Sequence, residues 1–159
     1  MVIKTLTLKD ADRILEFESN FAPKLPVYVP YDREQLDSYI FKNKDGKAFG
    51  AFENDLLVGW AGYSCREKAD GTDKGIYEMC GLVVHPNYRR QGIGLKLFQT
   101  RMTDLLKKPD LKRIYATNYP QNTPIILLYL TNGFVIYDFK KDLYGPGVDR
   151  LFLKYEKLG

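Results

Sequence analysis

The chain has 159 residues, a length that favours one domain, and 45% of them are hydrophobic, which excludes a disordered protein. Its 24 lysines and arginines against 20 aspartates and glutamates give a net charge of only +4, which fits any anionic partner. No apolar run approaches the roughly 20 residues of a membrane span, and the first residues do not resemble a secretory signal. We therefore expect a single cytoplasmic domain over residues 1–159, without a membrane or metal partner.

The first half of the chain predicts strands and helices in a mixed order. Asp32 followed by Gln35 is typical of a capping box at a helix start, and Asn54-Asp55 between two β-rich runs indicates a tight hairpin. In chain order, the expected elements are a strand at 2–8, helices at 10–21 and 32–43, and strands at 48–53, 56–66 and 76–84.

The second half predicts two more helices and three more strands. Apolar residues spaced by three and four predict a helix at 92–107, and Thr123-Pro124 begins another helix with proline at its first position. Gly133 stands where a left-handed helix cap is expected. The remaining strands are expected at 111–117, 134–143 and 150–155. The order predicts a mixed α/β (α+β) fold, a largely antiparallel sheet with helices packed on it.

The turn between the strand that ends at Val84 and the helix at 92–107 has the features of an anion site. Gly92 and Gly94 allow close approach of a ligand to the backbone, and the first N–H groups of a helix attract anions. Arg89 and Arg90 add positive charge beside them. This pattern predicts a phosphate or pyrophosphate at the turn.

Two common phosphate loops do not match this turn. A Walker A loop requires Gly-Lys-Ser/Thr, whereas Leu95-Lys96-Leu97 follows Gly94 here. A dinucleotide fingerprint requires a third small residue where Leu97 stands. Both assignments are set aside.

The turn instead resembles the pyrophosphate-binding motif of the GNAT superfamily of N-acetyltransferases, Arg/Gln-x-x-Gly-x-Gly/Ala. Arg89, Gly92 and Gly94 match that motif, and Val84-His85-Pro86 matches the strand end that precedes it in the family. The resemblance implies a mixed sheet of about seven strands with about four helices, splayed between strands four and five to admit a cofactor.

A second signature of the superfamily lies downstream. Asn122 is followed seven residues later by Tyr129 and then by Gly133-Phe134, as in the family pattern. The resemblance implies acetyl-CoA as cofactor, with its pyrophosphate on the glycine turn, its pantetheine arm beside Asn122 and along the strand end, and an oxyanion-binding N–H near Leu82. The implied cofactor-binding residues are Leu82, Val83, Val84, Arg89, Arg90, Gln91, Gly92, Ile93, Gly94, Leu95, Asn122 and Tyr129.

Two residues are candidates for the proton transfers of an acetyltransferase. Glu78 lies six residues before Val84, the offset of the base glutamate in one branch of the superfamily, and strict strand alternation would put it on the same face as Leu82. The alternative is a carboxylate that is paired with a lysine on a hairpin, or exposed. Tyr129 matches the family's general acid, which protonates the departing thiolate, and its alternative is a core tyrosine.

The acceptor would enter between two loops, at residues 21–31 and 144–150. Tyr28, Tyr31 and Tyr144 are candidate aromatic walls, and Asp149 is a candidate partner for a cationic amine. The alternative is that these aromatic residues only pack the loops.

Three functions are compatible with these patterns. The leading one is an acetyl-CoA-dependent N-acetyltransferase that transfers acetyl to a primary amine of a small molecule or peptide by direct attack in a ternary complex. The alternative is a non-catalytic acyl-CoA-binding or sensing module. A nucleic-acid-binding protein is disfavoured, because the chain has no basic run or aromatic platform motif. The resemblance also implies that a homodimer can form.

Overall fold

The computed structural model describes residues 1–23, 28 and 30–158. These residues form two compact units. The first unit contains Met1–Cys65 and Cys80–Pro109, and the second contains Arg66–Met79 and the residues from Asp110 onward. The single domain over 1–159 stays a prediction.

The described residues form a seven-stranded sheet in the order β1-β2-β3-β4-β5-β7-β6. The pairs β1–β2, β2–β3, β5–β7 and β6–β7 are antiparallel, whereas β4 and β5 are parallel. The strands are β1 Val2–Leu6, β2 Lys47–Glu53, β3 Leu56–Cys65, β4 Ile76–Val84, β5 Arg113–Asn118, β6 Val135–Lys140 and β7 Arg150–Glu156. The predicted mixed, largely antiparallel sheet is confirmed. The splay between strands four and five stays a prediction.

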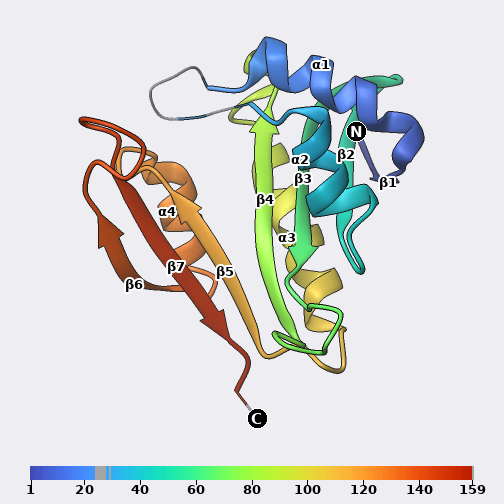
Figure 1. The fold of residues 1–159 in the computed structure, drawn as a ribbon. Helices are drawn as coiled ribbons and strands as arrows, with labels where there is room; N and C mark the ends of the chain where they lie inside the picture. Colours follow the sequence, from blue (N-terminus) through green and yellow to red (C-terminus); the bar gives the residue numbers. More distant parts are fainter. Residues whose placement is uncertain (24–27, 29, 159) are drawn as a thin grey trace. The chain divides into compact units, whose positions relative to one another are not determined.

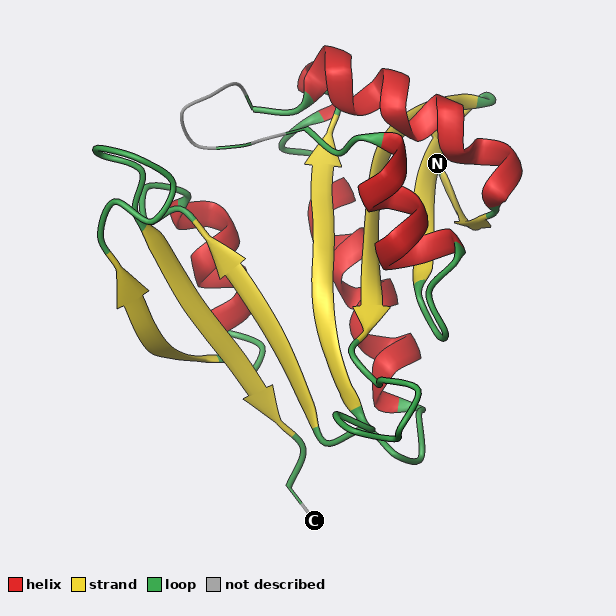
Figure 2. Cartoon of the chain, in the orientation of Figure 1, coloured by secondary structure: helices red, strands yellow, loops and turns green. Residues whose placement is uncertain are grey.

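Four α-helices accompany these strands in the described residues, as predicted (Figure 2). They are α1 Ala11–Phe21, α2 Arg33–Leu36, α3 Ile93–Leu106 and α4 Thr123–Leu130. Three short turns of other helix types are η1 Leu8–Asp10, η2 Asp37–Phe41 and η3 Pro86–Tyr88. None of the described helices is long and apolar enough to span a bilayer.

In the first unit, helices cover both faces of the strands. Figure 1 shows α2 on one face and α3 on the other, with α1 across the strand ends. Two of these helices each bury one charged residue within an apolar stripe: Arg101 in α3 and Glu18 in α1. The buried cluster beneath α1 and α2 consists of Leu6, Ala11, Ile14, Phe17, Leu36, Ile40, Ala48, Phe52, Leu57, Trp60, Cys80 and Val83.

In the second unit, α4 lies against β6, and aromatic side chains connect the end of α4 to β7. Tyr129 and Phe134 meet edge to face at 4.8 Å between ring centroids, and Phe134 lies 5.7 Å from Tyr155. Gly133 has φ +89°, as expected for the left-handed residue that ends the helix.

Several local predictions are confirmed, and some element ends differ. Asp32 and Gln35 form the expected capping box, and Asn54 and Asp55 both have positive φ in the β2–β3 hairpin. The second helix ends in a π-helical turn at Phe41 rather than at residue 43. The first strand stops at Leu6, because the following residues turn into η1. The strand expected at 134–143 ends at Lys140.

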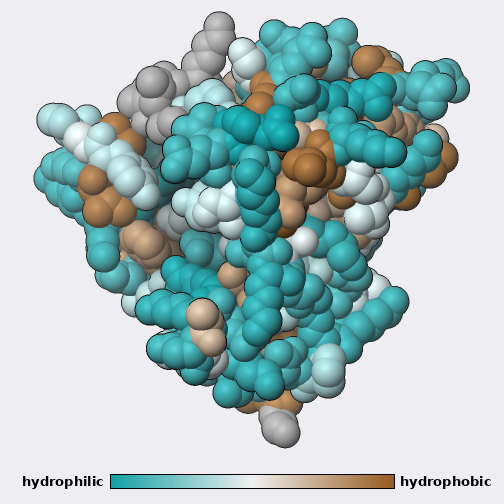
Figure 3. Space-filling view, turned by 45° about the vertical axis from the view of Figure 1, so that its right-hand side comes forward, coloured by the Kyte–Doolittle hydropathy of each residue, from teal (hydrophilic) through white to brown (hydrophobic). Residues whose placement is uncertain are grey.

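On the face shown in Figure 3, hydrophilic side chains predominate and hydrophobic ones form small, separate spots. Such scattered apolar atoms are normal on a protein surface.

Candidate cofactor and catalytic site

The loop after β4 is held by its own polar groups. His85 caps η3, and its Nδ1 accepts the N–H of Asn87 at 3.1 Å. The Nε of Arg89 donates to the carbonyl of Val84 at 3.0 Å, which ties the loop back to the strand end. The His85 ring also packs 4.1 Å from Phe21, so this histidine has a structural role.

The loop delivers the chain to the start of α3 in an unusual backbone conformation. Arg90 has φ +62° and Gly92, the residue that caps α3, has φ +79°. Gly92 makes no side-chain cap, so the first N–H groups of this 14-residue helix are not satisfied by a capping side chain. A helix end of this kind attracts an anion.

Space is available directly at the two glycines. A Cβ built on Gly92 meets nothing within 4 Å, and one on Gly94 meets only a methyl of Val84 at 3.8 Å. Ile93 is buried and anchors the turn, whereas Arg89, Arg90, Gln91, Gly92 and Leu95 are exposed around it. An uncapped helix end, open space and two arginines fit a pyrophosphate, so the residues predicted for that group are suitable.

The end of β4 precedes this turn. Leu82 and Val84 are half-buried and Val83 is buried. Gly81 has φ +61°, and the consecutive residues Met79 and Cys80 are both buried. The strict alternation expected from Glu78 to Leu82 is therefore wrong, because the backbone at Gly81 interrupts the regular pleat.

Glu78 lies in the first half of β4, in the second unit. It accepts a hydrogen bond from the Nε of Arg66 at 3.1 Å, and its side chain is 33% exposed. The Arg66 guanidinium also stacks 4.7 Å from the ring of Tyr115. This ion pair corresponds to the alternative raised from the sequence, with an arginine in place of the expected lysine. The role of Glu78 as base stays a prediction.

Asn122 and Tyr129 both belong to α4 or its cap. Asn122 is the N-cap residue, and its Nδ2 donates to Oδ1 of Asn118 at 3.1 Å. Tyr129 is only 4% exposed and packs on Phe134. The proposed acid is thus a well-packed side chain, and its catalytic role stays a prediction.

The four acceptor candidates fall into the two units. In the first, the hydroxyl of Tyr28 donates to Glu18, and that of Tyr31 accepts the N–H of Gly81. In the second, Oδ1 of Asp149 accepts the N–H of Asp142 at 2.8 Å. Residues 24–27 and 29 of the first acceptor loop lie outside the described residues.

Tyr144, the fourth candidate, is 64% exposed and lies beneath the Arg150 guanidinium at 5.2 Å. An exposed aromatic ring can form the wall of a binding site, but its role here stays a prediction.

Sequence reasoning missed three buried polar side chains. Glu18 and Arg101 are each 0% exposed, and Trp60 donates its Nε1–H to Glu18 at 2.7 Å. The available signal was a charged residue inside an apolar helical stripe: Glu18 follows Ile14 by four residues, and Arg101 follows Phe98 by three.

Burial dominates the ionisation of the Glu18 cluster. Removal from water raises the pKa of Glu18 above its usual value, although hydrogen bonds from Tyr28, Trp60 and the Tyr31 backbone act to lower it. Burial likewise raises the pKa of the Tyr28 and Tyr31 hydroxyls, and the nearby Glu18 carboxylate raises both further. Both hydroxyls therefore stay protonated near neutral pH.

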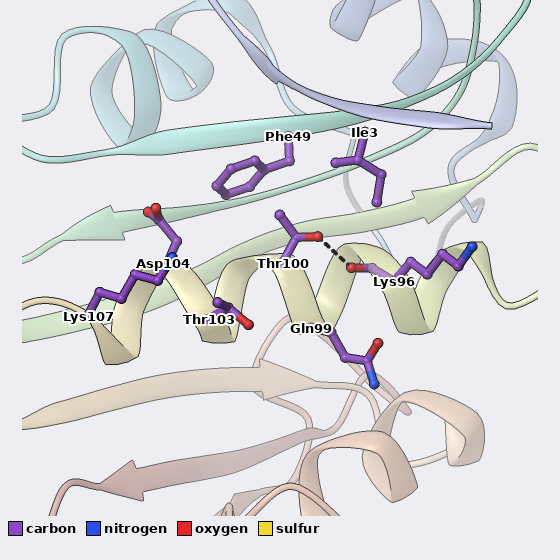
Figure 4. Close-up of a pocket in the computed structure, with 8 residues that line it drawn as sticks. All are labelled: Ile3, Phe49, Lys96, Gln99, Thr100, Thr103, Asp104 and Lys107. Atoms are coloured by element: carbon purple, nitrogen blue, oxygen red, sulfur yellow. Dashed lines mark hydrogen bonds between the residues drawn. The ribbon is translucent and has the colours of Figure 1, made fainter.

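A groove of about 410 Å³, separate from the glycine turn, lies between α3 and the strands β1 and β2 (Figure 4). Its lining includes Ile3, Phe49, Thr100 and Asp104, and none of the predicted site residues contributes to it. Asp104 is already engaged by Lys47 at 3.0 Å, so this groove does not present a free acid.

The sequence matches the family described as Acetyltransferase (GNAT) family over residues 12–134. Curated proteins similar to it include three from different organisms. A Bacillus subtilis protein named probable hydrolase YhcX is 31% identical over 132 residues, 72% of this chain and 25% of that protein. An uncharacterized Mycobacterium leprae protein, ML0378, is 30% identical over 98% of this chain and 41% of that protein. The chain thus spans less than half the length of both.

The third relative is closer in length. It is an N-alpha-acetyltransferase of Sulfurisphaera tokodaii, 25% identical over 92% of this chain and 87% of that protein.

Solved structures share the fold. The ribosomal-protein-S18-alanine N-acetyltransferase of Escherichia coli has a TM-score of 0.78 at 18% identity and covers 99% of this chain and 96% of its own. The yncA protein of Salmonella typhimurium, solved with acetyl-CoA, has a TM-score of 0.75 at 19% identity. The match covers 98% of this chain and 93% of that protein. Because the family match spans most of the sequence and includes the glycine turn, the chain belongs to the GNAT family of acetyltransferases, whose cofactor is acetyl-CoA.

Proposed function

We propose that the chain is an N-acetyltransferase that moves the acetyl group of acetyl-CoA to a primary amine of a small molecule or peptide. The observation that carries this proposal is the open, uncapped start of α3 at Gly92, in a chain of the acetyltransferase family. Acetyl-CoA supplies an acetyl group activated as a thioester.

Most of the proposed cofactor contacts belong to the first unit, and the other two, Asn122 and Tyr129, belong to the second. The N–H groups that follow Gly92 bind the pyrophosphate, and Arg89 and Arg90 add charge at the same exposed turn. The backbone of Leu82–Val84, at the end of β4, hydrogen-bonds to the pantetheine arm. The N–H of Leu82 donates to the thioester carbonyl oxygen, where negative charge develops during attack.

The reaction needs two proton transfers from or to this chain. An amine acceptor of lysine type has a pKa of about 10.4, so it arrives protonated and must first lose a proton, to Glu78 or to water. The amine nitrogen then forms a bond to the acetyl carbon as the carbon–sulfur bond breaks. Tyr129 gives its hydroxyl proton to the departing sulfur, and the proton released from nitrogen restores the phenol.

The acceptor is proposed at the level of a primary amine. One similar protein, from Sulfurisphaera tokodaii, is described as an N-alpha-acetyltransferase, and the fold is shared with the ribosomal-protein-S18-alanine N-acetyltransferase of Escherichia coli. Their similarity supports testing peptides with a free amino terminus before other amines. Tyr28 and Tyr31 of the first unit, and Tyr144 and Asp149 of the second, are the proposed acceptor contacts.

A second candidate function is an acyl-CoA-binding module without efficient transfer. The ion pair of Glu78 with Arg66 favours this candidate, because it occupies the carboxylate that would act as base. The packing of Tyr129 against Phe134 favours it as well.

Peptide acetylation distinguishes the two candidates. The assay measures release of coenzyme A thiol from acetyl-CoA with three matched peptides: one with a free amino terminus and no lysine, one blocked but containing lysine, and one blocked without lysine. Turnover with either of the first two, and none with the third, supports an N-acetyltransferase. Tight acetyl-CoA binding without turnover on these peptides or on small primary amines supports the binding module instead.

A further inference from the structure

Glu18, in the last turn of α1, is a completely buried carboxylate that receives hydrogen bonds where a cation would be expected. Its Oε1 accepts the Nε1–H of Trp60 at 2.7 Å, and the hydroxyl of Tyr28 lies 3.0 and 2.8 Å from its two oxygens. The backbone N–H of Tyr31 also donates to it. Among the described residues, no lysine or arginine forms an ion pair with Glu18. Such a charge persists only where several donors are held in place around it.

Tyr31 connects this cluster to β4. Its hydroxyl accepts the N–H of Gly81 at 3.2 Å, and its ring meets the Trp60 ring edge to face at 5.7 Å. A Cβ on Gly81 would lie 2.6 Å from the Trp60 ring, and φ at Gly81 is +61°. The Gly81 peptide therefore rests on the same tryptophan that donates to Glu18.

Arg101 holds the carbonyl group of Gly81. Its Nη1 donates to the carbonyl of Gly81 at 2.9 Å and to that of Gly62 at 3.0 Å. The guanidinium is completely buried, and its Nε and Nη2 have no hydrogen-bond partner in the described part of the chain. Gly81 is thus held at its N–H by Tyr31 and at its carbonyl by Arg101, directly before Leu82.

We infer that Glu18 is a positioning residue for acetyl transfer: by holding Tyr31 and Trp60 it fixes Gly81, and so sets the direction of the Leu82 N–H. This inference rests on the proposed function, in which that N–H donates to the thioester carbonyl oxygen. A preset backbone donor stabilises developing charge without reorganising during the reaction, and small misplacements are costly in rate. Acetyl-CoA affinity, set mainly at the glycine turn, does not depend on this contact.

The test combines Glu18→Gln, which removes the charge, with Tyr31→Phe, which removes the hydroxyl that accepts the Gly81 N–H. With the free-amino-terminus peptide, each variant should lower kcat about tenfold while the acetyl-CoA Kd stays within about twofold. The double variant should be no slower than the slower single one, because both changes break one chain of contacts. Glu16→Gln, at an exposed position of α1, is the matched control and should keep the wild-type kcat.

A second readout needs no acceptor. Trp60 is the single tryptophan of the sequence, so its fluorescence reports directly on the contact with Glu18. The wild-type signal and that of Glu16→Gln should change with pH as Glu18 takes up a proton, whereas Glu18→Gln should show no such titration.

The inference is overturned if Glu18→Gln keeps the wild-type kcat, if the two variants lower kcat additively, or if the Trp60 titration persists without the carboxylate. Failure of the proposed function has a different signature: the wild-type protein itself would release no coenzyme A with the peptides or with small primary amines. In that case the positioning role in catalysis fails with it, and the fluorescence titration still shows whether Glu18 acts on the aromatic cluster.

Discussion

Replacing Gly92 by alanine should separate the cost of backbone strain from the loss of a cofactor site. The backbone there has φ +79°, and a methyl group would meet no protein atom within 4 Å. The stability cost is therefore the left-handed strain alone, roughly 1–2 kcal/mol. For a chain of this size, that predicts a fall of about 2–8 °C in Tm.

The effect on acetyl-CoA should be larger, because the methyl group would occupy the space in front of the uncapped N–H groups of α3. Loss of hydrogen bonds to a charged ligand costs about 1.5–3 kcal/mol, which is a roughly ten- to 150-fold increase in Kd. Titration calorimetry measures the Kd, and acetyl-pantetheine, which lacks the pyrophosphate, should bind wild type and variant equally.

Gly71→Ala is the matched control. Gly71 has φ +82° and nothing within 4 Å of a built Cβ, so it has the same strain without the proposed ligand. It should lower Tm by a similar amount and leave the acetyl-CoA Kd unchanged. An unchanged Kd in Gly92→Ala, or an equal loss in Gly71→Ala, would refute the assignment of the pyrophosphate site.

Three further predictions concern the proton-transfer residues and the buried acid. Tyr129→Phe should lower kcat at least a hundredfold with little change in acetyl-CoA affinity. The control is Tyr155→Phe, which should keep the wild-type kcat although its ring also packs on Phe134. Equal rates in the two variants would show that Tyr129 has only a packing role. Glu78→Gln should change the free energy of unfolding by less than about 1 kcal/mol, because the ion pair of Glu78 with Arg66 is partly exposed. The same variant should slow acetyl transfer most at low pH. A pH–rate profile identical to that of wild type would leave water as the base. Burial raises the folded-state pKa of Glu18, so wild type should lose stability relative to Glu18→Gln as pH rises from about 4.5 through that raised pKa. Urea unfolding measures this loss. A difference in unfolding free energy between wild type and variant that does not change with pH would contradict the burial argument.

The parts of the fold predicted from sequence are those specified by short, local patterns. Asn54-Asp55 adopts the positive φ values of a tight hairpin, and Gly133 the left-handed conformation of a helix end. Gly92 is the same kind of case: a residue without Cβ at a turn that needs positive φ. The anion-binding turn could therefore be found without coordinates.

The environment of Glu18 could not be predicted in this way. Its place in an apolar helical stripe indicates burial, but its partner Trp60 is 42 residues away, and the pairing depends on how α1 packs on β3. Arg101 poses the same difficulty, because its Nη1 acts on carbonyls of two strands. Long-range contacts of this kind have no local signature.

The irregular backbone at Gly81 does have a local signature in the sequence. A glycine inside an apolar strand pattern suggests a bulge, and here it breaks the alternation that would place Glu78 on one face with Leu82. The partner of Glu78 was equally local in sequence, since Arg66 lies across the same hairpin-like turn, 12 residues earlier.

The central claim is that the turn from Arg89 to Gly94 binds the pyrophosphate of acetyl-CoA. The most direct test is calorimetric titration of the wild-type protein with acetyl-CoA, with dephospho-coenzyme A and ATP as comparators. We expect micromolar or tighter binding of acetyl-CoA, retained largely by dephospho-coenzyme A and weakened roughly ten- to 150-fold in Gly92→Ala. No binding of acetyl-CoA, or equal binding of ATP, would contradict it.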